Sequence, residues 1–117
     1  MDFTHTQRIE RPAGEVFAFV ADFENNPTWQ GGMVRCTWDG PERGVGSTYS
    51  QEARFFGRPI LTTFRVTALD PGRSISIESI QSTFPIQVTR TVALKDGGCT
   101  VTAHVRGQPT GLLKLFS

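Results

Sequence analysis

The sequence has few of the residue patterns that mark nucleic-acid-binding, membrane or exported proteins. Its 12 Lys and Arg residues balance 11 Asp and Glu residues and form no run, so the basic patch of a nucleic-acid-binding protein is missing. No apolar stretch approaches the roughly 20 residues of a membrane-spanning helix, and the N-terminus has no signal-peptide pattern. We therefore expect a cytoplasmic protein with no membrane span and no nucleic-acid partner.

Cysteine and histidine are also scarce. Cys36 and Cys99 are the only two cysteines, and without an export signal we expect two reduced thiols rather than a disulfide. His5 and His104 form no cluster of metal-ligand spacing with other residues, and no serine lies in a nucleophile elbow. Residues 44–46 lack the following helix and the lysine of a phosphate-binding loop. We expect neither a metal nor a cofactor.

Phenylalanine, by contrast, is abundant. Nine phenylalanines in 117 residues supply a large apolar area for a core or for the lining of a cavity. A chain of this length is expected to form a single domain, covering residues 1–117, that buries roughly two thirds of its unfolded surface.

Residues 10–30 have the only strong helical pattern in the sequence. Pro12 suits the first turn of a helix, because its missing N–H costs nothing there. Apolar residues recur at helical spacing over residues 16–20 and form one apolar face. Short polar residues and Pro27 then interrupt the helix, and a second short turn through Trp29 is expected. Because an amphipathic helix cannot bury its apolar face alone, it should pack on the strands that follow.

Most of the remaining chain alternates apolar and polar residues with the period of two that is typical of strands. Turn signals at 70–72 and 96–98 indicate hairpins. The predicted strands are residues 2–10, 33–39, 47–56, 59–69, 73–82, 84–94 and 99–107. One strand, a helix pair and six further strands predict an α+β domain with a mainly antiparallel sheet.

Several short motifs in this order resemble a known superfamily. They are Val16-Phe17, Val20, Asp22, Pro27 and Trp29, then Gly44-Val45-Gly46-Ser47-Thr48, Asp70-Pro71 with Arg73, and Gly97-Gly98 before Thr100-Val101. Together they cover residues 3–107 and resemble START-like polyketide cyclase/dehydrase domains, the superfamily of the birch-pollen allergen and the steroid-transfer domains. The resemblance implies a helix-grip fold, in which a curved seven-stranded antiparallel sheet wraps on a long C-terminal helix around a cavity for an apolar ligand.

The tail, residues 109–117, departs from that pattern. Thr110 suits an N-cap and an apolar helix begins after it, but the sequence has room for only the first turns of the long closing helix. Either the helix is truncated, or the cavity is open, or another copy covers it. Because soluble monomers seldom expose a large apolar sheet face, we predict a homodimer or an exchange of the tail between copies.

Polar residues in the inward phase of the predicted strands are candidates for ligand binding. Arg90 is in phase with Val88 and Val92, where a guanidinium needs an anion or a set of carbonyl groups. It is suited to holding a ligand carboxylate or enolate. Alternatively, a bulge reverses the phase, or Arg90 lies at a strand end and reaches water.

Other candidates also have two interpretations. Tyr49 beside Gln51 suits polarising a ligand carbonyl or transferring a proton, whereas a packed tyrosine is the structural alternative. Trp29 lines the cavity mouth or packs the helix pair on the sheet. His5 is an acid or base at the sheet edge, or an exposed N-terminal histidine. The predicted ligand-binding set is Trp29, Tyr49, Gln51, Phe55, Phe64, Ile77 and Arg90.

Three functions follow from these observations. The first is binding of a small hydrophobic ligand, whether aromatic, polyketide or lipid-like, in an internal cavity. The second is an enzyme of the same fold that catalyses aldol-type cyclisation or dehydration, with catalytic residues unassigned. The third is an interaction module whose concave sheet receives a helix from a protein partner.

Overall fold

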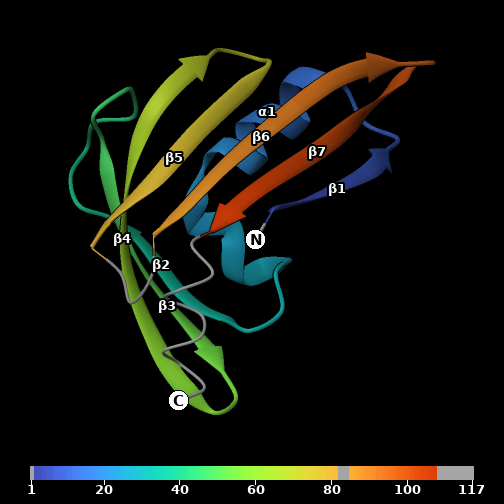
Figure 1. Ribbon diagram of the computed structural model, residues 1–117. Helices are drawn as coiled ribbons and strands as arrows, with labels where there is room; N and C mark the ends of the chain where they lie inside the picture. Colours follow the sequence, from blue (N-terminus) through green and yellow to red (C-terminus); the bar gives the residue numbers. More distant parts are fainter. Residues whose placement is uncertain (1, 82–84, 108–117) are drawn as a thin grey trace.

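The computed structural model describes residues 2–81 and 85–107, which form one curved sheet with two short helical segments on its concave side (Figure 1). The elements are β1 (Asp2–Ile9), α1 (Ala13–Ala21), the 3-10 helix η1 (Phe23–Thr28), β2 (Met33–Trp38), β3 (Thr48–Phe55), β4 (Arg58–Asp70), β5 (Ser74–Gln81), β6 (Ile86–Lys95) and β7 (Gly98–Gly107). The predicted α+β helix-grip architecture is confirmed. The predicted tail helix at 109–117 lies outside the described residues.

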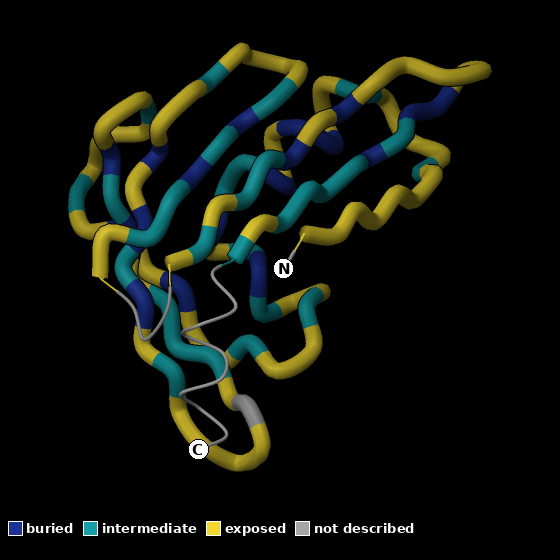
Figure 2. Tube along the Cα trace, in the orientation of Figure 1, coloured by how far each residue is buried: buried dark blue, intermediate teal, exposed yellow. Residues whose placement is uncertain are grey.

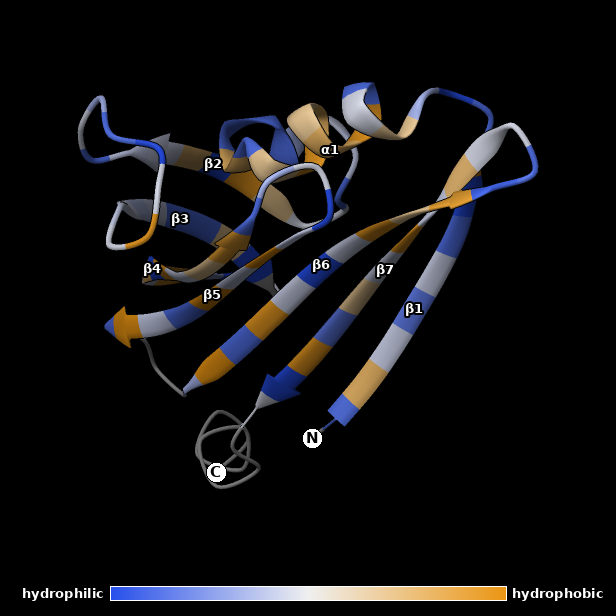
Figure 3. Ribbon diagram, turned by 90° about the horizontal axis from the view of Figure 1, so that it is seen from above, coloured by the Kyte–Doolittle hydropathy of each residue, from blue (hydrophilic) through white to orange (hydrophobic). Residues whose placement is uncertain are grey.

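The sheet has the strand order β1-β7-β6-β5-β4-β3-β2, and every neighbouring pair is antiparallel. The first strand thus pairs with the last, which places the N-terminal strand beside the end of the described chain. In the view from above, the strands curve around the two helical segments (Figure 3). This topology brings side chains from β1, β6 and β7 to the same part of the concave face as α1.

Helix α1 covers that face with the apolar stripe that the sequence predicts. The residues of α1 that are buried are Val16, Phe17 and Val20. The helix contacts β5, β6 and β7, because its stripe can leave water only against the sheet. No helix of the described residues is long and apolar enough to cross a membrane.

Asp22 separates the two helical segments. Its backbone is extended, and its carboxylate accepts a hydrogen bond from the Glu24 N–H at 3.2 Å, which caps η1. The same Oδ1 atom accepts a bond from the Trp38 indole Nε1–H at 2.9 Å. Asp22 therefore fixes the angle between α1 and η1 and fastens η1 to β2.

Four aromatic side chains form the core beneath η1. The rings of Phe23 and Tyr49 stack with centroids 4.7 Å apart, and the rings of Phe64 and Tyr49 stack at 5.2 Å. Trp38 meets Tyr49 edge-on at 5.5 Å. The buried segments cluster where the strands face the helices, whereas β1 is exposed along nearly its whole length (Figure 2). The phenylalanines that are buried, Phe17, Phe23 and Phe64, therefore belong to a packed core.

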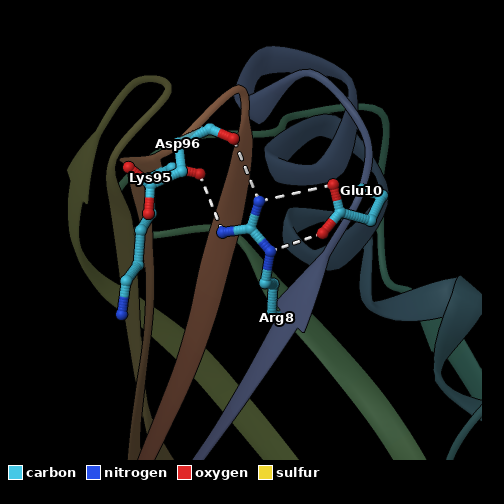
Figure 4. A network of polar contacts seen from close by, with 4 residues as sticks. All are labelled: Arg8, Glu10, Lys95 and Asp96. Atoms are coloured by element: carbon cyan, nitrogen blue, oxygen red, sulfur yellow. Dashed lines mark hydrogen bonds and ion pairs between the residues drawn. The ribbon is translucent and has the colours of Figure 1, made fainter.

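An exposed polar network fastens the end of β1 to the hairpin between β6 and β7 (Figure 4). The Arg8 guanidinium pairs with the Glu10 carboxylate. It also donates hydrogen bonds to the carbonyl oxygens of Lys95 at 2.9 Å and Asp96 at 3.1 Å. The Arg8 side chain thus joins β1, the residues that follow it and the β6–β7 hairpin, at the point where the chain leaves β1 for α1.

Gly98 lies at the same corner and leaves no room for a side chain. A Cβ atom there would lie 2.7 Å from the Ile9 carbonyl oxygen, closer than real Cβ contacts allow. We expect Gly98→Ala to lower the free energy of unfolding by about 1–3 kcal/mol, because the backbone of β1 must shift. Urea denaturation measures this effect. Gly44→Ala, at a site with nothing within 4 Å, is the control, and equal costs for the two variants would refute the explanation.

Candidate ligand-binding site

A pocket of about 520 Å³ lies between α1 and the β1-β7-β6 end of the sheet. Its apolar lining residues are Ile9, Val16, Phe19, Val20, Trp29, Val101 and Ala103, and its polar ones are His5, Gln7, Arg11, Glu15 and Arg90. Four of these residues are buried and form its floor: Val16, Val20, Arg90 and Val101. Hollows of similar volume beside residues 39–48 and 91–94 each have a single buried lining residue, Ser47 in the one and Val92 in the other. The first pocket is therefore the candidate site.

Strand register explains how residues from three strands meet in this pocket. Arg90 of β6 is opposite Ala103 of β7, and Ala103 is opposite His5 of β1. In the neighbouring row, Val101 lies between Val92 and Gln7. Because directly opposed residues point to the same face of a sheet, each row presents its side chains together to the concave side.

Arg90 is the most unusual residue of the pocket. It is 4% exposed, and its Nη1 donates hydrogen bonds to the Val20 carbonyl oxygen at 2.8 Å and to Asn26 Oδ1 at 2.9 Å. Its Nε–H is buried without a partner. Burial lowers the pKa of Arg90 to about 10, which still leaves the guanidinium charged at neutral pH. The inward orientation predicted from strand phase is confirmed, and neither a bulge nor a strand end provides an exit to water.

Two aromatic rings enclose the guanidinium. The Cζ atom of Arg90 lies 4.6 Å from the ring centroid of Phe23 and 4.9 Å from that of Trp29. Both distances fall within the range of cation–π attraction. Phe23 is fully buried, whereas Trp29 is 43% exposed. The guanidinium is thus held between the aromatic core and an indole at the edge of the pocket.

Asn26 is a site residue that the sequence analysis missed. It is buried, and while its Oδ1 accepts from Arg90, its Nδ2 donates to Cys36 Sγ at 3.6 Å. Burial raises the pKa of the Cys36 thiol. Cys36 and Cys99 are both buried and free, as predicted. In sequence Asn26 resembles any turn asparagine before a proline, so no local signal marks it.

The other charged residues of the pocket lie at its mouth. Arg11 Nη1 and Glu15 Oε1 are 3.4 Å apart in an exposed pair one helical turn apart. Among the described residues, no carboxylate forms an ion pair with Arg90. The same part of the chain holds no group of three His, Cys, Asp or Glu side chains placed to bind a metal. Arg90 is therefore a buried cation whose known acceptors are neutral.

The structure separates the predicted ligand-binding residues into two groups. Trp29 and Arg90 line the pocket, and His5 lines it with them. Three others are buried in the core and do not line it: Tyr49, Phe64 and Ile77. Burial raises the pKa of the Tyr49 phenol, which disfavours its ionised form.

Gln51 and Phe55 fall outside both groups. Gln51 is half-buried, accepts a weak hydrogen bond from Cys36 Sγ at 3.8 Å, and borders a separate groove on β2, β3 and β4. The side chain of Phe55 lies outside the part that the structure describes. A contact of either residue with a ligand therefore stays a prediction.

Comparisons with known proteins agree with the fold and identify the family. Solved structures with the same fold include a START superfamily protein from Mycobacterium smegmatis (14% identity, TM-score 0.79, covering 92% of this chain and 76% of that chain). The Zhui aromatase/cyclase from Streptomyces sp. R1128 is similar at 16% identity and a TM-score of 0.74, covering 92% of this chain and 68% of that chain. The major latex-like protein 151 from Panax ginseng is similar at 15% identity and a TM-score of 0.75, covering 99% and 89%.

At the level of sequence, no curated protein is significantly similar to this chain. The family profile described as polyketide cyclase / dehydrase and lipid transport, however, matches residues 1–117. That match covers every element of the sheet and both helical segments. The chain therefore belongs to the polyketide cyclase/dehydrase and lipid transport family.

Proposed function

We propose that the protein binds a small hydrophobic ligand in the pocket between α1 and the β1-β7-β6 end of the sheet. The observation that supports this proposal most is the pocket itself, of about 520 Å³, with an apolar lining and a few polar groups. Ligand sites of proteins have roughly this size and composition, about 300–1,000 Å³. Affinity would come from burial of apolar surface, at about 25 cal/mol per Å².

Each part of the pocket has a distinct role in this proposal. Val16, Val20 and Val101 provide the apolar floor, and the exposed indole of Trp29 covers a flat ligand at the edge. Arg90 sets the orientation of the ligand through its charge. The buried residues Tyr49, Phe64 and Ile77 belong to the core and do not line the pocket.

A second candidate function is a cyclase/dehydrase-type enzyme that uses the same pocket. It is favoured by the presence of His5, Gln7 and Arg90 in one lining, because an imidazole and a guanidinium can move a proton and stabilise an enolate. The solved aromatase/cyclase of the same fold is consistent with it. Loss of turnover in His5→Ala with most of the ligand affinity retained would identify the enzyme.

A variant in which a large side chain fills the pocket tests the binding function. Ala103 is half-buried and lines the pocket between Arg90 and His5, so an indole at this position would occupy the space above β7. We expect Ala103→Trp to weaken binding of the neutral dye N-phenyl-1-naphthylamine at least about tenfold, because the apolar surface that the dye would cover is already covered. Titration of dye fluorescence measures the dissociation constant.

Ala68→Trp is the matched control, since Ala68 is exposed on β4 and lies outside the pocket. The control should bind the dye as the original protein does. Equal dye affinity in both tryptophan variants would place the dye elsewhere and refute the proposed pocket. If small apolar molecules fail to displace the dye while a helical protein partner does, the interaction-module function is favoured instead.

A further inference from the structure

The guanidinium of Arg90 has an unused edge. Both of its hydrogen bonds to the protein leave from Nη1, towards the neutral oxygens of Val20 and Asn26. Nε is buried without a partner, and no bond from Nη2 to a described residue is found. The Nε–Nη2 edge is one of the two guanidinium edges that can bind a carboxylate through a pair of parallel hydrogen bonds. The donors that remain are thus arranged for a two-oxygen anion.

Nothing in the described part of the chain neutralises this charge. The rings of Phe23 and Trp29 attract the cation but carry no net charge. Glu15, the carboxylate in the lining, pairs with Arg11 at the exposed mouth. A buried guanidinium that keeps its charge and has no counter-ion is costly. The missing charge is expected to come from outside these described residues, and a bound anion can supply it.

The strand register leaves space for an anion beside Arg90. Ala103 lies between Arg90 and His5 in one cross-strand row. Since neighbouring strands are about 4.8 Å apart, the backbones of Arg90 and His5 are separated by roughly 10 Å. The side chain between them is a single methyl group. His5 is exposed and lines the pocket, and its imidazole can donate a hydrogen bond to an oxygen above that methyl group.

We propose that the ligand of this pocket is an amphipathic acid. Its delocalised oxyanion, such as a carboxylate, lies over Ala103 between Arg90 and His5, and its apolar body lies against Val20, Val101 and Phe19. This inference rests on the proposed function and deepens it, because it assigns the charge of the ligand. A neutral ligand of the same shape would leave the guanidinium as unsatisfied as it is in the free protein.

Decanoate and 1-decanol test the proposal as a matched pair. Each is used at neutral pH to displace N-phenyl-1-naphthylamine, and the readout is the ratio of their displacement constants within one protein. We expect the original protein to prefer decanoate by at least about tenfold, because charge-assisted hydrogen bonds are the stronger kind. In Arg90→Met the ratio should fall close to one. If a variant simply binds the dye more weakly, both displacement constants change by the same factor and the ratio does not change.

Two further variants, Asn26→Asp and His5→Leu, and a control, Arg65→Met, keep the test decisive if Arg90→Met does not fold. Asn26→Asp places a carboxylate beside Arg90 with almost no change of volume, so this internal counter-ion should also bring the ratio close to one. Arg65→Met removes the same charge from an exposed position on β4 and should keep the full preference. In His5→Leu we expect a decrease of about threefold, since one donor is lost while Arg90 remains.

The possible failures are distinguishable. If the dye does not bind the original protein, the proposed function fails and this inference fails with it. If the dye binds and decanol displaces it as well as decanoate does, the pocket binds apolar ligands and the acid proposal is overturned. An unchanged preference for decanoate in Arg90→Met and Asn26→Asp would also overturn the acid proposal, because the preference would then come from a group other than Arg90.

Discussion

Replacing Phe23 with alanine should lower the free energy of unfolding by about 3–5 kcal/mol. The Phe23 ring is 1% exposed, stacks on Tyr49 at 4.7 Å and meets Trp38 edge-on at 6.0 Å. It also forms one face of the enclosure of Arg90. Truncation removes the apolar contacts and leaves a cavity that the two neighbouring rings and the Arg90 guanidinium cannot easily fill. Urea denaturation followed by tryptophan fluorescence measures the change.

Phe19→Ala is the matched control for Phe23→Ala. Phe19 is 44% exposed on α1, so the same chemical change should cost only about 1 kcal/mol or less. Comparable costs for the two variants would show that η1 does not anchor the core. A larger loss at Phe23 than at Phe19 would support the view that the buried aromatic cluster fastens η1 to the sheet.

Asn26→Ala should have the second largest effect, about 2–4 kcal/mol of unfolding free energy. The substitution removes the amide oxygen that accepts from Arg90 at 2.9 Å and the amide donor to Cys36 Sγ. The Val20 carbonyl oxygen is then the remaining known acceptor for a buried cation. Because the side chain is small, the cost comes mainly from the unsatisfied charge and not from lost apolar contact. Thermal or urea unfolding measures it.

Asn25 offers a comparison within the same turn. Its Nδ2 donates to the Phe19 carbonyl oxygen at 3.1 Å, but its side chain is only half-buried and no charged group depends on it. We expect Asn25→Ala to cost about 1 kcal/mol. If Asn26→Ala cost no more than that, the Arg90 charge would be satisfied by other means, and the guanidinium would not need an external anion.

The alternation of side chains predicted the strands and most of the inward-facing residues. Phe64 and Val66 are buried as their phase indicates, and so are Ile75 and Ile77. Leu94 shows where this reasoning fails. It is in phase with Val92, yet it is 82% exposed because the end of β6 has no cover on that side. Strand phase determines the face to which a side chain points, whereas burial depends on what packs there.

The candidate site was predictable to a smaller extent. Phase alone placed Arg90 inside, but its two acceptors come from residues 70 and 64 positions away in the sequence. Tyr49, the single tyrosine of the chain, was a candidate for chemistry, and the structure packs it against Phe23 and Phe64. A phenol in an inward phase suits either role, and only the position of η1 decides between them.

The amino-acid sequence by itself determined the seven strands, the interrupted helix and the family resemblance, because periodicity and turn residues act over a few neighbouring positions. The tertiary structure decided which concave side chains fill the core and which border an open pocket. It also placed His5, Ala103 and Arg90 in one row, since that depends on β1 pairing with β7 across nearly the whole chain. Such long-range register is set by the packing of the entire sheet and leaves no local mark in the sequence.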